Sequence, residues 1–228
     1  MKTAISPDTR THAYTTVRPD VSELVPESAM TILDVGCSDG SLGKSLARAR
    51  EGRKVYGVEL NEDFALKASA GLDGVLCADV NQLDWETLMP GMNFDCIIFA
   101  DVLEHLIDPP RHLLAAKSKL TPGGCIVVSL PNIRHVSALF SIFIKGTFPS
   151  RDRGIFDSTH LRWYTVGDAK LLIARSGMKI EKLTCNLRVG DQGGGFVNRA
   201  VNRFLGPLQQ TYLIREFLAY QICFKAIL

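Results

Sequence analysis

Several signals that would point to other classes of protein are missing from this sequence of 228 residues. Its six cysteines are widely spaced and include no Cys-x-x-Cys pair, which argues against a zinc site. No apolar run approaches the roughly 20 residues that a membrane-spanning helix needs, and the N-terminal stretch lacks the apolar core of a secretory signal. We therefore expect a cytoplasmic protein with reduced cysteines and no transmembrane segment.

The sequence also lacks an excess of charge of either sign. Lysine and arginine number 26 against 24 aspartates and glutamates, so the formal net charge is +2. Nucleic acids and anionic membranes attract strongly basic chains, and this balance therefore argues against both a nucleic-acid partner and a polybasic membrane anchor. With 46% hydrophobic residues, the composition is that of an ordinary globular domain.

The sequence does contain a regular alternation of strand-like and helical patterns. Such an alternation predicts a parallel sheet covered by helices on both faces. We expect a doubly wound α/β fold with a seven-stranded, mostly parallel sheet, whose last strand is antiparallel and closes the edge. The expected strands are residues 31–35, 54–59, 74–78, 94–99, 124–130, 179–187 and 219–227, and the expected helices are residues 41–49, 62–70, 110–120 and 166–176.

Two segments interrupt this alternation. Residues 131–164 mix apolar, basic and histidine residues, and residues 188–215 begin with a glycine-rich stretch that continues into a partly amphipathic helix. Insertions of this length in a compact domain are more often functional loops than accidents. We therefore treat residues 1–228 as one domain in which these two segments cover a substrate.

The strongest local signal is the stretch ILDVGCSDGSLGKSLA, from Ile32 to Ala47. A buried strand enters a tight turn and then a helix, with Gly36 and Gly40 where the chain must turn sharply or let a ligand approach. The exposed amides at the start of such a helix suit an anionic group. The alternative is an ordinary strand-to-helix turn that uses glycine only for its geometry.

Acidic residues mark the ends of the following strands. Glu59 lies 23 residues beyond Gly36, a distance at which a carboxylate can accept hydrogen bonds from both hydroxyls of a ribose. Asp79 follows the third strand, where it can accept from an adenine amino group, and Asp101 follows the fourth. A solvent-facing glutamate and a helix-starting aspartate are the alternatives. Because these strand ends fall on one edge of the sheet, together they predict a nucleoside site.

These motifs resemble those of class I S-adenosylmethionine-dependent methyltransferases. Asp34, Gly36 and Gly40 match the acidic-x-Gly-x-Gly-x-Gly loop of that family, although Ser38 replaces its middle glycine. The resemblance implies S-adenosylmethionine as cofactor and S-adenosylhomocysteine as product, with Arg18 pairing with the methionine carboxylate. The implied cofactor contacts are Tyr14, Arg18, Asp34, Gly36, Cys37, Gly40, Glu59, Leu60, Asp79, Val80, Ala100 and Asp101.

Two rival interpretations remain open. A dinucleotide-binding dehydrogenase prefers GxGxxG, whereas this chain has GCSDGS after its first strand. Dehydrogenases also usually continue with a second mononucleotide-binding half, for which little chain remains. The other rival is a subunit that binds the cofactor without catalysis and regulates a partner.

Methyl transfer to a hydroxyl requires that the hydroxyl proton leaves as the new bond forms. A base with a pKa of about 7 assists this step, and histidine is the natural choice. We expect His160, within DSTHLRWYT, to be the general base, and His105, just beyond the fourth strand, to orient it or to act as an alternate base. We interpret His12 and His112 as surface residues.

A metal site is the alternative interpretation of the same histidines. The spacing Asp101-x-x-Glu104-His105 resembles the acidic-x-x-Glu-His metal site of some ubiquinone-pathway and small-RNA 3′-end methyltransferases. With His160 as a further ligand, these groups would hold Mg²⁺ or a transition metal. Many relatives carry Leu-Glu-His without a metal, so we expect none and interpret Glu104 and His105 as ordering the loop over the cofactor.

The cover segment also carries candidate substrate ligands, namely Arg134, Asp157 and Arg162. Arginine suits phosphates and carboxylates, so a phosphorylated or nucleotide-linked small molecule fits as acceptor. The apolar run VSALFSIFIKGTF is interpreted as lid packing or as the contact of a homodimer. The segment resembles bacterial polysaccharide-associated methyltransferases, which implies a sugar, nucleotide-sugar or glycan precursor as acceptor; a quinone or other aromatic hydroxyl, or a nitrogen, is the alternative.

Overall fold

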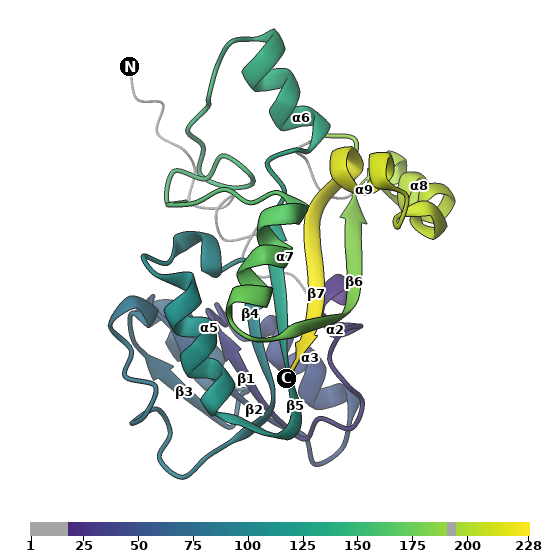
Figure 1. The fold of residues 1–228 in the computed structure, drawn as a ribbon. Coiled ribbons are helices and arrows are strands. Elements are labelled where there is room, and N and C mark those ends of the chain that lie inside the picture. The colour runs from purple at the N-terminus through teal and green to yellow at the C-terminus, as the bar shows by residue number, and fades with distance from the viewer. Residues whose placement is uncertain (1–17, 191–194) are drawn as a thin grey trace.

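The computed structural model describes residues 18–190 and 195–228 (Figure 1). At its centre is one sheet of seven strands in the order β3-β2-β1-β4-β5-β7-β6. The strands are β1 (Thr31–Val35), β2 (Lys54–Glu59), β3 (Gly74–Cys77), β4 (Phe94–Ala100), β5 (Leu120–Pro131), β6 (Lys179–Leu187) and β7 (Ala219–Ile227). The predicted α/β fold is therefore confirmed.

The position of the last strand differs from the expectation. Strands β1 to β5 are parallel to one another, and β7 runs antiparallel to both β5 and β6, as predicted. However, β7 lies between β5 and β6, so that β6 forms the edge. Nearly all of β7 is buried, whereas β6 is mostly exposed or half-buried. The nearly continuous apolar sequence of β7 suits this interior position, because its side chains pack into the apolar cores on both faces of the sheet.

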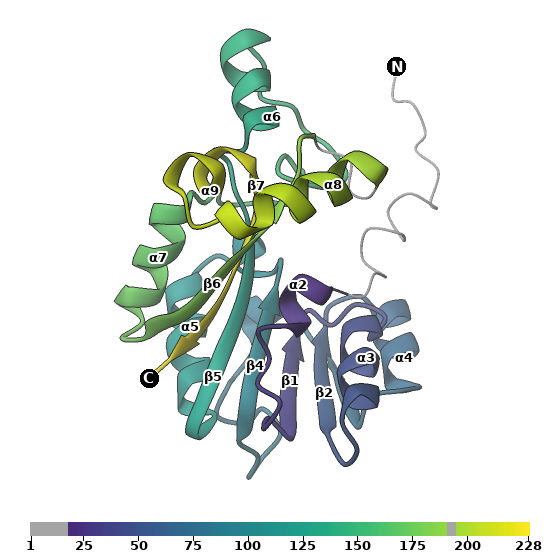
Figure 2. The same cartoon turned by 90° about the vertical axis from the view of Figure 1, so that its right-hand side faces the viewer.

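Helices cover both faces of the sheet, with α2, α3 and α4 on one side and α5 and α7 on the other (Figure 2). Each layer has its own apolar core: Leu42 of α3 shares a buried cluster with Val21 of α2, and Leu113 of α5 shares another with Ile173 of α7. The helices and short 3-10 turns of these layers are α2 (Pro19–Ser22), α3 (Ser41–Ala49), α4 (Glu62–Ser69), η1 (Val80–Gln82), η2 (Leu103–His105), α5 (Pro109–Ser118) and α7 (Val166–Arg175).

The sequence determines locally where several of these helices begin. The side chains of Asn61 and Asp108 accept hydrogen bonds from backbone amides in the first turns of α4 and α5. Thr165 and Asp168 form a capping box at the start of α7. Such caps satisfy amides that have no partner inside the helix, and so they fix the boundary.

The two irregular segments lie together at the end of the molecule where β5 ends (Figures 1 and 2). The first forms α6 (Val136–Leu139), which continues into the π-helical turn η3 (Phe140–Ile144); the second forms α8 (Gly195–Leu205), η4 (Gly206–Leu208) and α9 (Tyr212–Leu218). We refer to both as the cover. Within the described ranges, no helix combines the length and apolarity needed to cross a membrane.

His112 is buried, contrary to the expectation of a surface residue. Its side chain is 2% exposed, and its Nδ1 accepts a hydrogen bond of 3.1 Å from Nε1 of Trp85. The residue lies on the face of α5 that packs on the sheet, and helical periodicity thus outweighs its polarity. Burial lowers the pKa of this imidazole and favours its neutral form.

Asn132, just beyond β5, fastens the sheet to the cover. Its side chain is fully buried, and its amide nitrogen donates to the carbonyl oxygens of Glu216 at 2.9 Å and Ala219 at 3.0 Å. Its side-chain oxygen accepts from the backbone N–H of Arg134 at 3.0 Å. One amide group therefore satisfies backbone atoms from α9, β7 and the start of the cover.

We expect Asn132→Ala to lower the free energy of unfolding by about 2–3 kcal/mol, because buried backbone groups lose their hydrogen-bond partner. Urea denaturation measures this change. Asn93 is exposed and provides the matched control, since its replacement by alanine should cost less than about 0.5 kcal/mol. Equal effects of the two substitutions would contradict the anchoring role.

Candidate active site

The carboxyl ends of β1, β2, β3 and β4 meet at one edge of the sheet. Val35 at the end of β1 pairs in register with Val58 of β2 and with Phe99 of β4. Tyr14, also expected at this site, lies outside the described residues. The expected cofactor residues that the topology brings to this edge are Asp34, Gly36, Cys37, Gly40, Glu59, Leu60, Asp79, Val80, Ala100 and Asp101.

The loop after β1 has room only for small residues. Gly36 has a φ of +74°, and a Cβ at this position would lie 2.5 Å from Cγ2 of Val102. Gly40 has a φ of +78° and starts α3 without a side-chain cap. Ser38, at the middle position of the motif, also has a positive φ of +50°. The serine therefore keeps the backbone geometry of a glycine, at some cost in strain.

The acidic residues at the next two strand ends bind nearby backbone groups. Glu59 accepts hydrogen bonds of 2.8 Å from the backbone N–H groups of both Ser38 and Asn61, and so ties the first loop to the second. Asp79 caps η1 by accepting from a backbone N–H at 2.9 Å, which is the structural role weighed for it from the sequence. Leu60, next to Glu59, is 67% exposed and offers an apolar surface at the same edge.

Asp34 is sealed beneath the loop after β1. Its side chain is 1% exposed, and its Oδ2 has no hydrogen-bond partner within the described residues. Burial, and then repulsion from Glu59, raise the pKa of Asp34 to about 7. Oγ of Ser38, in the loop itself, also lacks a partner within that part of the chain. Unsatisfied buried polar atoms are rare in folded proteins and call for a functional explanation.

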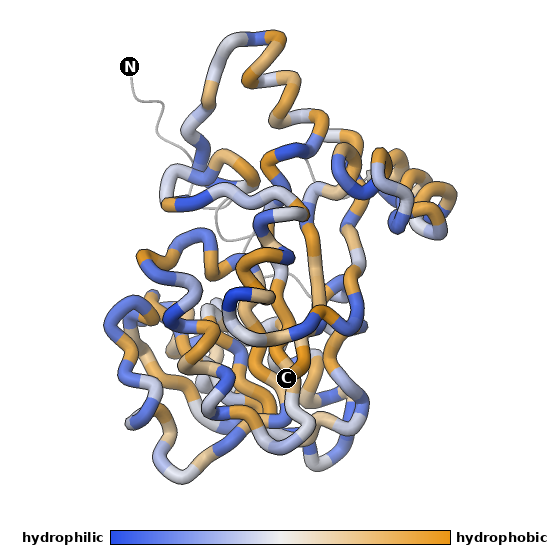
Figure 3. The backbone as a smooth tube through the Cα atoms, in the orientation of Figure 1, coloured by the Kyte–Doolittle hydropathy of each residue, from blue (hydrophilic) through white to orange (hydrophobic). Residues whose placement is uncertain are grey.

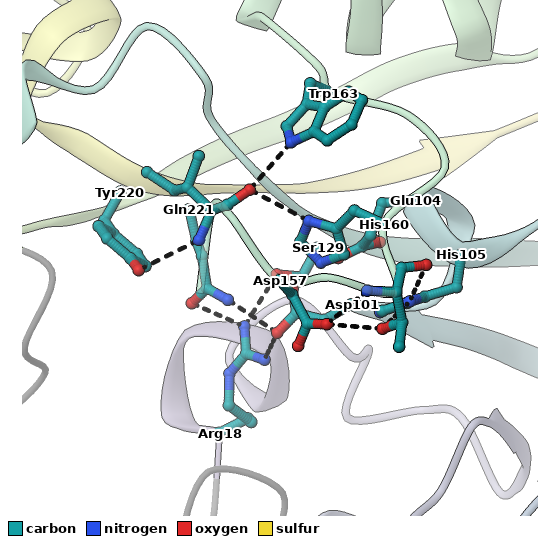
Figure 4. Close-up of polar contacts among 12 residues, drawn as sticks. Arg18, Asp101, Glu104, His105, Ser129, Asp157, His160, Trp163, Tyr220 and Gln221 are labelled. Carbon is teal, nitrogen blue, oxygen red and sulfur yellow. Dashed lines mark hydrogen bonds and ion pairs between the residues drawn. The ribbon is translucent and has the colours of Figure 1, made fainter. Parts of the chain in front are cut away.

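Arg18 and Asp101 form the centre of a polar network beside this loop (Figure 4). Oδ2 of Asp101 accepts from the Arg18 guanidinium at 2.5 Å and from Nε2 of Gln221 at 2.7 Å, and Oδ1 accepts from Oγ of Ser129 at 2.9 Å. Arg18 also donates to both carboxylate oxygens of Asp20. The guanidinium expected to bind the methionine carboxylate is thus held by two carboxylates of the protein.

Glu104, His105 and His160 meet beyond the end of β4. One nitrogen or carboxylate oxygen from each lies within 4.8 Å of the others. Nε2 of His160 is 3.8 Å from Oε1 of Glu104, and the two imidazole rings meet edge to face with centroids 4.7 Å apart. Three of the four residues of the metal hypothesis therefore come together, while Asp101 is bound to Arg18.

Backbone carbonyls orient both histidines (Figure 4). Nδ1 of His160 donates to the carbonyl of Ile155 at 3.2 Å, and Nδ1 of His105 donates to the carbonyl of Thr159 at 3.2 Å. Because a carbonyl can only accept, Nδ1 carries the proton in each ring. The lone pair on Nε2 of His160 consequently faces Glu104, and this is the arrangement found in histidines that act as bases or as metal ligands.

Burial shifts this cluster toward its uncharged forms. Glu104 is fully buried, and neither of its carboxylate oxygens has a hydrogen-bond partner within the described ranges. Burial raises the pKa of Glu104, with a further contribution from Asp101. Burial also lowers the pKa of His160, with a further contribution from His105. The cluster therefore presents a neutral imidazole beside a carboxyl group that is costly to ionise.

The three residues expected to bind substrate each contact other groups of the protein. Arg134 donates to Glu216 of α9 at 3.0 Å, and Arg162 donates to a backbone carbonyl of the loop before α5. Asp157 is 5% exposed and accepts from the backbone N–H and the hydroxyl of Thr159. In this arrangement these side chains brace the cover, and their contact with a substrate remains a prediction.

The sequence analysis missed two residues of the polar network, Ser129 and Gln221. Ser129 interrupts the apolar run of β5, and Gln221 that of β7; they are 0% and 9% exposed. A polar residue inside an otherwise apolar strand was the available signal, because a buried polar group needs a partner. The identity of that partner could not be read from the sequence, since Arg18 and Asp101 lie far away along the chain.

Two surface hollows lie away from this edge of the sheet. Their volumes are about 480 and 520 Å³, and none of the residues expected at the site lines either of them. The first lies beside Lys44 and Gly71, and the second beside Lys170 and Met178. The location of the candidate site therefore rests on the strand ends and on the unsatisfied polar atoms, not on these hollows.

Comparison with known protein families decides the identity of the fold. A family profile described as a methyltransferase domain matches residues 9–183, which is most of the chain. This chain belongs to the class I methyltransferase family. The matched residues include all the strand ends described above, and S-adenosylmethionine is the methyl donor that the family uses.

Curated relatives of the methyltransferase carry the name ubiquinone biosynthesis O-methyltransferase. The protein of that name from Xylella fastidiosa is 34% identical over 139 residues, covering 59% of this chain and 55% of the relative. The one from Parvibaculum lavamentivorans is 28% identical over 171 residues, covering 72% and 65%. This chain thus spans about half the length of most of the curated relatives that it matches.

Solved structures support the same fold. Magnesium protoporphyrin IX methyltransferase from Synechocystis, solved with bound S-adenosylhomocysteine, matches with a TM-score of 0.62 at 17% identity, covering 99% of this chain and 89% of that chain. A methyltransferase from Mesorhizobium loti matches with a TM-score of 0.57 at 20% identity, covering 91% and 95%. At these identities the likeness establishes the fold alone.

We expect Gly36→Ala to weaken the binding of S-adenosylhomocysteine by about 100-fold or more. The added Cβ clashes with Val102, and the loop must either move or hold a strain of several kcal/mol. Gly52→Ala is the matched control: its φ is +76°, but the nearest atom to the added Cβ is 3.5 Å away and the site is distant. Isothermal titration calorimetry measures both affinities. Wild-type affinity in the Gly36 variant would show that this loop does not contact the cofactor.

We expect the unfolding free energy of the ligand-free methyltransferase to depend on pH through Asp34. Its pKa rises from 3.8 in the unfolded chain to about 7 in the fold, so the stability contribution is lost as the pH rises across that interval. In the wild type, this group should lower the free energy of unfolding by on the order of 2–4 kcal/mol between about pH 4 and pH 7, and Asp34→Asn should abolish that decrease. Urea denaturation at several pH values tests this, and parallel curves for both proteins would refute it.

Proposed function

We propose that this chain transfers the methyl group of S-adenosylmethionine to a hydroxyl oxygen of a small acceptor held beside Glu104, His105 and His160. The observation that carries the proposal is this cluster, which sets a neutral imidazole lone pair and an unpartnered carboxyl group beyond the end of β4. A hydroxyl must lose its proton in such a transfer, and the cluster is the part of the described edge equipped for that.

The residues at the strand ends fit the cofactor. Gly36 lacks the Cβ that would close the loop onto Val102. Asp39 accepts from the first backbone N–H of α3, that of Ser41, at 3.0 Å, and the amides that follow it at the start of the helix suit a carboxylate. Glu59 already orients its carboxylate between two loops and has lone pairs left for ribose hydroxyls. Leu60 provides an exposed apolar side chain against which an adenine ring would pack.

The reaction itself requires little of the protein beyond alignment and proton removal. The acceptor oxygen forms a bond to the methyl carbon as the bond from that carbon to sulfur breaks, which yields the methyl ether, S-adenosylhomocysteine and a proton. Alignment requires the oxygen to lie opposite sulfur in a site that excludes water. We assign proton removal to His160, whose Nδ1 is bound to a carbonyl and whose Nε2 lone pair faces Glu104 at 3.8 Å.

The same cluster also suits a divalent cation, which the sequence analysis did not expect. Glu104, His105 and His160 provide an oxygen and two imidazoles within 4.8 Å of one another, and the carbonyls that bind both Nδ1 atoms resemble the outer hydrogen bonds of ligated histidines. A bound divalent cation supplies Lewis acidity that lowers the pKa of a nearby hydroxyl. With such a cation His160 would be a ligand, and without it His160 would be the base.

An aromatic hydroxyl is the acceptor we propose. The curated relatives are named for ubiquinone biosynthesis, and the expected sugar or glycan acceptor has no support among them. The two arginines that favoured a phosphorylated or nucleotide-linked acceptor already donate to oxygens of the protein, Arg134 to Glu216 and Arg162 to the carbonyl of Ile107. Two aromatic side chains lie beside the cluster, Trp163 and Phe148. Their rings meet edge to face with centroids 5.1 Å apart, and they suit an aromatic acceptor ring.

All six cysteines are free thiols, which agrees with a cytoplasmic location.

The test measures methyl transfer to dihydroxylated aromatic acceptors by wild type, His160→Ala and Glu104→Gln, each with and without a chelator. We expect both substitutions to reduce turnover by about 100-fold or more, with an unchanged affinity for S-adenosylhomocysteine. Glu62→Gln is the matched control, because Glu62 is an exposed residue of α4. If the cation is present, chelation reduces wild-type turnover and added Mg²⁺ or a transition metal restores it.

Other outcomes would overturn parts of the proposal. Turnover that resists the chelator but is lost in His160→Ala would refute the cation and leave His160 as the base. Full turnover in His160→Ala would refute the role of the cluster. Cofactor binding without methylation of aromatic hydroxyls, sugars or amines would favour the interpretation of a regulatory subunit without catalytic activity.

A further inference from the structure

The cover, which lies beyond the carboxyl end of β5, exposes large apolar side chains. Phe143 and Ile144 of η3 are 75% and 71% exposed, and Phe196 and Phe204 of α8 are 79% and 74% exposed. Both elements belong to the cover: η3 ends the helix that projects from the molecule, and α8 lies beside α9 near the base of that helix (Figures 1 and 2). The tube is strongly apolar along the projecting helix (Figure 3). We call these four residues, with Phe140 and Phe148, the apolar tip.

The orientation of α8 is the reverse of that of an ordinary surface helix. Its asparagines face the protein: Asn198 accepts from the backbone N–H of Val189, and Asn202 both accepts from and donates to the backbone of Leu187. The phenylalanines of the same helix face outward. A surface helix normally buries its apolar stripe and exposes its polar one, whereas α8 leaves two large aromatic side chains without burial in the fold.

The projecting helix of α6 and η3 shows the same reversal. Its buried positions are occupied by the small residues Ala138 and Ser141, which are 0% and 5% exposed. Oγ of Ser141 donates to a backbone carbonyl one turn earlier. Phe140 and Phe143, which are much larger, face out. The projecting helix and α8 therefore both turn aromatic side chains outward, with small residues inward in the first and asparagines inward in the second.

Positive charge accompanies this apolar surface. Residues 131–164 and 188–218, which span the cover, contain nine arginines and lysines against four aspartates and glutamates, whereas the whole chain has a net charge of only +2. Lys145, Arg153, Arg199 and Arg203 are exposed in these segments. The nearly neutral net charge of the whole chain therefore combines a basic cover with a remainder of the chain that has more acidic than basic residues. A surface that combines exposed aromatic residues with cations complements an apolar layer bordered by negative charge.

We propose that the apolar tip docks this methyltransferase on the surface of an anionic lipid bilayer. The phenylalanines of η3 and α8 enter the boundary between head groups and acyl chains, and the neighbouring cations bind lipid phosphates. Single helices that lie in a membrane surface combine an apolar face with lysines and arginines in this way. The charge complementarity selects a lipid surface over a second copy of the chain, because two basic covers would repel one another.

A chain of contacts links the apolar tip to the candidate active site. The exposed ring of Phe148 meets the ring of Trp163 edge to face, with centroids 5.1 Å apart. Trp163 donates to the same Ile155 carbonyl that orients His160. Two residues, Trp163 and Ile155, therefore stand between Phe148 and the imidazole of His160. Docking itself does not depend on the proposed function, but together the two would let an apolar acceptor pass from the lipid to the site.

The test is co-sedimentation of the full chain with vesicles of phosphatidylcholine alone and with vesicles that also contain phosphatidylglycerol. We expect binding to the anionic vesicles, a loss of that binding at high salt, and a decrease of about tenfold in partitioning for each of Phe143→Ser and Phe196→Ser. Leu66→Ser is the matched control, since Leu66 is 73% exposed on α4, outside the cover. Affinity for S-adenosylhomocysteine in each variant confirms folding.

Three outcomes would overturn the proposal. One is equal, weak sedimentation with both kinds of vesicle. A second is equal loss of binding in Leu66→Ser and the cover variants, which would indicate nonspecific adsorption. A third is an absence of vesicle binding together with a dimer, seen by light scattering, that Phe143→Ser dissociates. The apolar tip would then be a contact between two copies. Loss of vesicle binding with retained methylation of a water-soluble acceptor would support docking and leave the proposed function intact.

Discussion

The carboxylate of Asp101 is the point on which the geometry of the site depends. It accepts hydrogen bonds from Arg18 before β1, from Ser129 of β5 and from Gln221 of β7, and thus joins the beginning, the middle and the end of the described chain. Its own backbone has a φ of +58°, a conformation that persists only where surrounding contacts enforce it. Glu104 and His105 follow within four residues, so their position depends on this junction.

Suppressed charge is the second feature of the site. Asp34 and Glu104 are both buried with oxygens that no described group satisfies, and burial raises the pKa of each. Carboxyl groups in such surroundings destabilise the ligand-free fold. Their retention makes sense if the bound state provides what the free protein lacks, namely hydrogen bonds or positive charge.

The parts of the fold that sequence patterns predict well are those governed by local periodicity. Apolar runs located the strands, and caps such as Asn61 located the helix starts. The order of β6 and β7 was predicted wrongly, because both sequences satisfy a strand pattern and only the packing of Phe224 and Ile222 between neighbours decides which is interior. His112 was misplaced for a similar reason, since its burial depends on the partner Trp85, 27 residues away.

The sequence by itself determined the family and the residues at the strand ends, because parallel strands deliver their carboxyl ends to one edge whatever the loops do. It also supplied Glu104, His105 and His160 as candidates. Only the tertiary structure decided how these residues are arranged. It brought Glu104, His105 and His160 together, bound Asp101 to Arg18, and paired Arg134 with Glu216 in the cover. The reason is that a side chain's role depends on which distant groups share its surroundings, and chain order does not encode those distances directly.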